Sequence, residues 1–212
     1  MEAIQGIGAK IYSLLQGVSP LRKKLFGQMA DDICRYIASG NILDVGTGPG
    51  YLPFEITRRS ELEIVGIDLS EAMINIARKN MKKNNPDAPI RFEVADASNL
   101  PFADESFDFV VSTMSMHHWS KPQLCIGEIG RVLKKSGTAW IYDIWCDISK
   151  ERSAQVRIKY GFFPWLVLLQ IVRRHSSTTR KRALEIITSS HYAFSNVEIE
   201  EFDFLLKIIL TK

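Results

Sequence analysis

The stretch from Asn41 to Gly50 constrains the fold of this chain more than any other, and it reads Asn-Ile-Leu-Asp-Val-Gly-Thr-Gly-Pro-Gly. Its first half, with Ile42, Leu43 and Val45, is an apolar run typical of a buried parallel strand. Glycine at every second position of its second half allows the backbone to turn sharply beside a ligand. A strand, a glycine loop and a following helix together predict the nucleotide-binding edge of a doubly wound α/β sheet.

Two other interpretations of this loop stay open at this point. A dinucleotide fingerprint would place Gly or Ala where this chain has Tyr51, whose bulk would crowd a pyrophosphate, so NAD is disfavoured. A purely structural glycine turn, without any ligand, would need the same residues. The rest of the chain has to distinguish these possibilities.

Composition limits the class of protein. With 212 residues, 46% of them hydrophobic, the chain can bury a sizeable core in a single domain. It has no apolar run of membrane-spanning length and no signal-peptide pattern at its start, so we expect a soluble, cytoplasmic protein. Its three cysteines are far apart and form no Cys-x-x-Cys pair, so neither a disulfide framework nor a metal site is predicted.

Acidic residues follow the next two predicted strands. Residues 63–67 form the second strand, and Asp68 follows it 18 positions after Gly50. A doubly wound sheet brings that strand tip beside the first loop, where a carboxylate can accept hydrogen bonds from both hydroxyls of a ribose. The alternative is that Asp68 only caps the helix predicted over 70–83. A third strand, 90–94, is followed by Asp96.

These motifs resemble those of the class I S-adenosylmethionine-dependent methyltransferases. Leu43 to Gly50 is similar to the family's first motif, and Gly66-Ile67-Asp68-Leu69-Ser70 to its second. Leu100-Pro101-Phe102 is similar to its usual run into the fourth strand, here 107–112. Leu133, Lys134 and Gly137 fit its Leu-Lys-Pro-Gly-Gly turn, although the proline is missing. The resemblance covers nearly the whole chain and is most specific over 41–137, and it points to the small-molecule branch that includes the quinone-biosynthesis carbon methyltransferases.

The resemblance implies S-adenosylmethionine as cofactor and a set of residues that bind it. Asp68 would hold the ribose and Asp96 the adenine amino group, while Met73 would border the adenine and Asp44 would order the loop. The full set implied is Asp44, Gly46, Thr47, Gly48, Gly50, Tyr51, Leu52, Asp68, Leu69, Met73, Asp96, Ala97, Ser112 and Met114. No metal is expected.

The loop after the fourth strand, 112–119, is expected to border the reactive methyl group, because ligands bind at the carboxyl ends of central strands. An imidazole is suited to general-base work near neutral pH, and His117 is the candidate here, with His118 as a lesser one. Asp143 and Asp147, near the end of the fifth strand, are alternative bases. Shaping of the pocket alone is the competing interpretation of both histidines.

We therefore expect an α/β, Rossmann-like three-layer sandwich built on a seven-stranded, mostly parallel sheet. A helical segment, 1–40, would cover the pocket, with Tyr12 as a candidate contact, and would include an amphipathic helix that starts at Pro20. The cofactor-binding core would span 41–147, with a helix over 121–134 that ends in a left-handed Gly137 and a fifth strand over 138–144. A helical insert, 148–195, and an antiparallel strand pair, 196–212, would complete a single domain.

The insert is basic: residues 148–212 carry 11 Lys and Arg against 6 Asp and Glu, whereas residues 1–147 carry 16 against 18. Its apolar run, 161–172, is too short to span a bilayer. Together with the arginines up to 182 it suggests either a lid over the pocket or peripheral contact with an anionic membrane. RNA binding is disfavoured, because aromatic residues are not interleaved with the arginines. DNA is not expected either, since no Asn-Pro-Pro-Tyr motif follows the fourth strand.

A small, apolar or lipophilic molecule is the expected methyl acceptor. The alternative functions are a protein that binds S-adenosylmethionine or S-adenosylhomocysteine without transferring a methyl group, and an RNA methyltransferase that uses the basic insert. The sequence predicts no oligomeric state.

Overall fold

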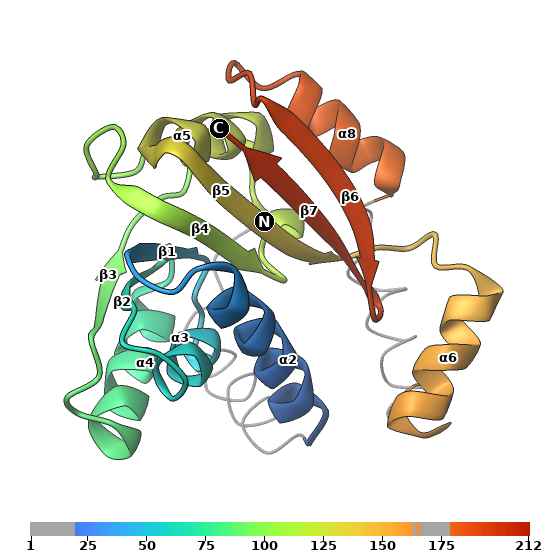
Figure 1. Ribbon diagram of the computed structural model, residues 1–212, viewed down its shortest axis with the longest axis horizontal. Coiled ribbons are helices and arrows are strands. Elements are labelled where there is room, and N and C mark those ends of the chain that lie inside the picture. The colour runs from blue at the N-terminus through green and yellow to red at the C-terminus, as the bar shows by residue number, and fades with distance from the viewer. Residues whose placement is uncertain (1–19, 163–164, 166–178) are drawn as a thin grey trace.

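The computed structural model describes residues 20–162, 165 and 179–212, and its centre is a seven-stranded sheet of order β3-β2-β1-β4-β5-β7-β6 (Figure 1). The strands are β1 Asn41–Val45, β2 Glu63–Asp68, β3 Ile90–Val94, β4 Phe107–Thr113, β5 Leu133–Ile144, β6 Asn196–Phe202 and β7 Leu205–Thr211. The first five strands pair in parallel, and β7 runs antiparallel to both β5 and β6. The predicted Rossmann-like architecture is therefore confirmed.

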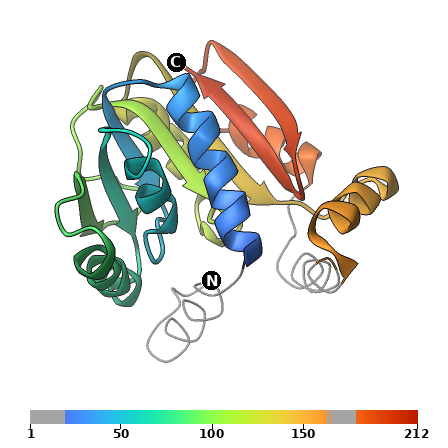
Figure 2. The same ribbon diagram turned by 60° about the horizontal axis from the view of Figure 1, so that its bottom comes forward.

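Helices cover both faces of the sheet. On one face lie α2 Pro20–Tyr36, α3 Tyr51–Thr57 and α4 Glu71–Asn84. On the other face lie α5 Pro122–Val132 and α8 Arg180–Thr188. Figure 2 shows α2 in front of the sheet and α8 behind it. The remaining helical elements are the short 3₁₀ turn η1 Met116–His118 and α6 Lys150–Tyr160, which lies beyond the sheet near the turn between β6 and β7.

The two faces follow from the alternation of side chains along buried strands. In β1, Ile42 packs with the α2 side of the core and Leu43 with the α5 side, and both are fully buried. In β5, Tyr142 and Ile141 are divided between the faces in the same way. Strands that are apolar on both faces need helices on both sides, which places their carboxyl ends along one open edge.

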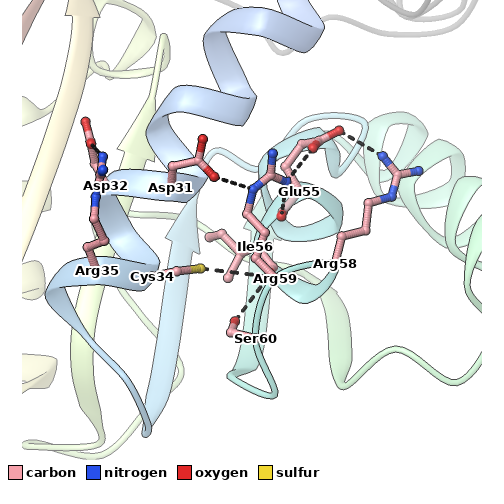
Figure 3. A network of polar contacts seen from close by, with 9 residues as sticks. All are labelled: Asp31, Asp32, Cys34, Arg35, Glu55, Ile56, Arg58, Arg59 and Ser60. Atoms are coloured by element: carbon pink, nitrogen blue, oxygen red, sulfur yellow. Dashed lines mark hydrogen bonds and ion pairs between the residues drawn. The ribbon is translucent and has the colours of Figure 1, made fainter.

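Polar contacts tie α2 to α3 (Figure 3). The Arg59 guanidinium, just after α3, donates to Asp31 of α2 at 2.6 Å and to the Glu55 carboxylate at 2.7 Å. The side chain of Glu55 is only 8% exposed, and Arg58 donates to it at 2.9 Å. Because Glu55 is buried, its charge depends on these two guanidiniums for compensation.

The turn into β5 differs from the prediction. The helix ends at Val132 rather than at 134, and β5 begins directly afterwards at Leu133, which pairs with Phe107. The prediction of a left-handed Gly137 is wrong, because the residue with a positive φ is Ser136, at 63°. Gly137 is needed for a different reason: a Cβ there would lie 2.9 Å from the carbonyl oxygen of Lys134.

Much of the predicted lid and insert cannot be placed. Tyr12 and most of 161–182, including the proposed membrane contact, lie outside the described residues. Of the described parts of the insert, α8 packs against α5, and Lys159 of α6 bonds to Asp203 in the β6–β7 turn. Neither α6 nor α8 borders the cavity described below. No helix in the described part of the chain combines the length and the apolar character that crossing a membrane requires.

Candidate active site

A cavity opens at the carboxyl ends of β1, β2, β3 and β4, at the edge where the sequence places its glycine loop and acidic residues. Eleven of the predicted residues border it: Gly46, Thr47, Gly48, Tyr51, Leu52, Asp68, Leu69, Met73, Asp96, Ala97 and Met114. Four other predicted residues, Asp44, Gly50, Ser112 and His117, do not border it. Parallel strands therefore bring residues that are up to 68 positions apart, from 46 to 114, to one cavity.

The glycine loop has the conformation that its sequence requires. Gly46, Gly48 and Gly50 all have positive φ, between 52° and 80°, which side chains with a Cβ rarely adopt. A Cβ on Gly46 would lie 2.0 Å from Ser115 Oγ, and one on Gly50 would lie 2.7 Å from the ring of Phe92. A Cβ on Gly48 would meet no atom within 4 Å, so the loop is open to the cavity at this position.

Asp68 links β2 to the glycine loop. Its Oδ2 accepts the Gly48 N–H at 2.9 Å, and its Oδ1 accepts the Ser70 N–H at 2.8 Å. Ser70, not Asp68, is the N-cap of α4, because its Oγ accepts the N–H of Met73. Burial raises the pKa of Asp68, and the two backbone N–H groups partly offset the rise. A carboxylate oxygen accepts more than one hydrogen bond, so Asp68 retains acceptor capacity toward the cavity.

Asp96 borders the cavity at the far side of β2. Its Oδ1 accepts both the N–H and the hydroxyl of Ser98, at 2.8 and 2.9 Å, which fixes the turn after β3. Unlike Asp68, it is exposed. The two carboxylates therefore border the same cavity, together with Leu69 and Met73.

Asp44 lies beneath the loop rather than in the cavity wall. It is 1% exposed, and neither its carboxylate oxygens nor Thr47 Oγ1 completes a hydrogen bond. Burial raises the pKa of Asp44 to about 7, and the nearby Thr47 hydroxyl limits the rise. A buried carboxyl group without a partner is costly in a folded protein, so this position favours a compensating donor or cation close by.

The other two predicted cofactor residues outside the cavity hold the strands around it. Ser112 is fully buried, and its hydroxyl donates to the carbonyl oxygen of Val45 at 2.8 Å, which joins β4 to β1. Gly50 leaves room for Phe92, which packs under the loop. Both residues thus shape the edge of the sheet.

The two histidines of the loop after β4 lie against each other, with ring centroids 4.0 Å apart, but only one of them borders the cavity. His117 is held by Asp143, which lies 2.5 Å from His117 Nδ1, and the His117 side chain is 4% exposed. His118 is exposed and borders the cavity. Of the alternative bases, Asp143 is fully buried behind this loop and Asp147 is exposed away from the cavity.

Several cavity residues were not identified from the sequence as binding residues. They include Phe26 of α2, Thr113 and Ser115 at the end of β4, Trp119 and Ser120 after η1, and Cys125 of α5. Burial raises the pKa of the Cys125 thiol to about 12, so this group is uncharged at neutral pH. Trp119 is the last residue of the predicted loop and Ser120 directly follows it, so both were within reach of sequence reasoning. Phe26 and Cys125 lie in helices in which no sequence pattern distinguishes the residues that border the cavity from those of the core.

Comparisons with known proteins agree with this geometry. Residues 43–141 match a family model described as a methyltransferase domain. The curated relatives include a demethylmenaquinone methyltransferase of Porphyromonas gingivalis, 32% identical over 57% of this chain and 50% of that protein. They also include the ubiquinone/menaquinone biosynthesis C-methyltransferase of Geobacter sulfurreducens, 31% identical over 61% of this chain and 50% of that protein. The chain thus spans about half the length of these curated relatives.

Among solved structures, the fold is similar over its full length to a candidate S-adenosyl-L-methionine-dependent methyltransferase from Methanococcus maripaludis. The TM-score is 0.80 at 25% sequence identity, and the match covers 100% of this chain and 95% of the other. The similarity therefore includes the elements on both sides of the matched region.

Proposed function

Because this chain belongs to the class I S-adenosylmethionine-dependent methyltransferase family, we propose that it binds S-adenosylmethionine in this cavity and methylates a small, apolar acceptor. The observation that carries the proposal is the single wall formed by the open Gly48 loop, Asp68 and Asp96. These are a backbone that a ligand can approach closely and two carboxylates that can accept hydrogen bonds.

The cavity wall suits each part of this cofactor. Asp68 would accept hydrogen bonds from the ribose hydroxyls, and Asp96 one from the adenine amino group. Gly48 would leave room for the methionine portion, and the unpartnered Asp44 below would offset its positive charge. When bound, S-adenosylmethionine supplies a methyl carbon already activated by the sulfonium charge, so the protein has chiefly to align the acceptor and exclude water.

The chemistry of the remaining cavity wall favours an uncharged acceptor. This part of the lining consists largely of Phe26, Tyr51, Met114, Trp119 and the neutral thiol of Cys125. No Lys or Arg is among the described lining residues, and both lining carboxylates lie on the proposed cofactor side. Without a charged side chain to compensate it, a charged acceptor would be poorly bound here. The names of the two curated relatives are consistent with a quinone-like ring.

We assign the proton-accepting role to His118 rather than to His117. A general base must come within hydrogen-bond reach of the proton that it removes. His118 borders the cavity, whereas His117 is buried against Asp143. An acceptor that loses a proton, such as a phenol or an activated ring carbon, would therefore depend on His118.

Calorimetric titration of the purified protein with S-adenosylmethionine, S-adenosylhomocysteine and NAD tests the cofactor. Binding of the first two and not of NAD is expected. Transfer is then tested with tritiated S-adenosylmethionine and 1,4-naphthoquinone in its reduced form as the apolar probe, with benzoate as the charged comparison. Binding of none of the three titrated compounds would refute the proposal. Binding without transfer to any screened acceptor would favour a cofactor-binding protein that is not a transferase.

A further inference from the structure

The loop from Met114 to Trp119 contributes Met114, Ser115, His118 and Trp119 to the lining of the cavity, and it is held in an unusual conformation. Met114 has a φ of 50°, which is rare for a residue with a side chain. Its N–H donates to the carbonyl oxygen of Tyr142 in β5 at 2.7 Å. Trp119 Nε1 donates to Ser115 Oγ at 3.1 Å, which closes the loop on itself. Such a backbone persists only where its surroundings fix it.

Asp143 of β5 makes further hydrogen bonds that fix this loop. One oxygen accepts the His117 N–H at 2.7 Å, and the other lies 2.5 Å from His117 Nδ1 and accepts the Ile144 N–H at 2.7 Å. The Asp143 side chain is 0% exposed. A single β5 carboxylate therefore accepts hydrogen bonds from both the backbone N–H and the ring of His117. The bond to the ring requires a proton on Nδ1 of His117.

The ring of His118 packs against the ring of His117, with the two centroids 4.0 Å apart and the planes inclined by 46°. Fixing the His117 ring against Asp143 therefore also fixes the surface on which His118 rests. His118 in turn borders the cavity, which His117 does not.

We propose that Asp143 and His117 form a positioning pair that holds His118 and Trp119 on the acceptor side of the cavity. The inference rests on the proposed function, because that proposal assigns this part of the cavity to the methyl acceptor. Neither residue of the pair borders the cavity, so the pair acts through the loop and not on the acceptor. The hydrogen bonds of Asp143 go to His117 and Ile144, whereas those of Asp68 and Asp96 go to Gly48, Ser70 and Ser98, so we expect the cofactor wall to be less affected than the loop.

Two His117 variants separate positioning from general structure. In His117→Asn, the side-chain amide can replace the Nδ1–H donor, whereas His117→Ala cannot donate to Asp143. With reduced 1,4-naphthoquinone as acceptor, we expect His117→Ala to lower kcat about 10- to 100-fold, because a residue that orients a catalytic side chain commonly has an effect of this size. We expect His117→Asn to recover most of that loss. The Kd for S-adenosylhomocysteine should stay within about twofold in both variants, because neither variant replaces a residue of the cofactor wall.

A readout without an acceptor accompanies the kinetics. Diethyl pyrocarbonate modifies exposed imidazoles, and mass spectrometry reports the rate at His118. Bound S-adenosylhomocysteine should slow this reaction in the unaltered protein and in His117→Asn, and should do so less in His117→Ala. Unchanged turnover together with unchanged protection in His117→Ala would overturn the positioning role. If the unaltered protein binds no S-adenosylhomocysteine, the proposed function fails instead. In that case, equal rates of His118 modification without ligand in all three proteins would overturn the positioning role of Asp143 and His117.

Discussion

Asp44 is a carboxyl group whose burial makes the stability of the ligand-free protein depend on pH. Its pKa is raised from 3.8 to about 7. Between these values the folded protein holds a proton that the unfolded chain has released, so the contribution of Asp44 to stability falls as pH rises from about 4 to 7. The side chain is fully buried, which makes the effect large.

We predict that Asp44→Asn, which cannot ionise, is more stable than the unaltered protein above pH 7. The gain should grow across the window from pH 4 to 7 and reach at most about 4 kcal/mol, the equivalent of about three pKa units. Urea denaturation of both proteins at several pH values measures it. Parallel curves of unfolding free energy against pH would contradict the assignment. The variant should also bind S-adenosylmethionine more weakly, because it lacks the negative charge.

Asp68 has two partners on the protein and, by our proposal, one on the ligand. Asp68→Ala should weaken S-adenosylmethionine binding by about 1.5–3 kcal/mol, because charge-assisted hydrogen bonds are lost and the Gly48 N–H is released. Calorimetric titration measures the change. Asp104→Ala is the matched control, since its carboxylate is 74% exposed and does not border the cavity. Equal affinities of both variants would remove the ribose role.

At the scale of single residues, the sequence predicts the cofactor wall better than the acceptor wall. Gly48, Asp68 and Asp96 each follow a parallel strand, so strand order alone brings them to one edge. Phe26 and Cys125 reach the cavity through the rotation of their helices, which tertiary packing determines. The two histidines show the same limit, because the burial of His117 depends on its contact with Asp143, which is 26 residues away in the sequence.

Among the elements, the contact between α2 and α3 matters because each helix lends an aromatic residue to the cavity, Phe26 and Tyr51. We predict that Arg59→Met destabilises the protein by about 1–3 kcal/mol, because the buried Glu55 loses one of its two guanidinium partners. Denaturant midpoints at unchanged slope measure this loss.

Arg58→Met is the matched control for that variant. Arg58 pairs with the same carboxylate, but its side chain is 52% exposed, compared with 30% for Arg59, and it makes no contact with Asp31. We expect a loss of no more than about 1 kcal/mol, as for other solvent-exposed ion pairs. A larger effect for Arg58→Met than for Arg59→Met would show that the link to Asp31 does not stabilise the interface.

The element order was predictable because apolar runs, glycine turns and acidic strand ends recur at the intervals of an α/β sheet. The third strand has its predicted bounds, and β2 and β4 each extend one residue beyond theirs. The early start of β5 was not predictable, since Leu133 belongs to the strand only because it pairs with Phe107, which is distant in the sequence. Ser136 has the left-handed conformation expected of Gly137, whereas Gly137 leaves room for the carbonyl oxygen of Lys134.

For the whole molecule, cofactor binding should appear as thermal stabilisation. A ligand at 100 times its Kd adds about 2.7 kcal/mol to the free energy of unfolding, which for a chain of this size raises Tm by roughly 5–10 °C. Differential scanning fluorimetry with S-adenosylhomocysteine measures the shift, and NAD at the same concentration should produce none. A comparable shift with both compounds would count against a site selective for the adenosylhomocysteine framework.

The placement of β7 between β5 and β6 has a consequence for synthesis on the ribosome. β5 is complete at Ile144, whereas its antiparallel neighbour, β7, begins only at Leu205, after every other strand of the sheet. At a translation rate of about 5–20 residues per second, roughly 3–12 seconds separate the two. During that interval the nascent sheet ends at an unpaired β5, whose open N–H and C=O groups can template pairing with a foreign strand. The edge closes only when the last strand emerges.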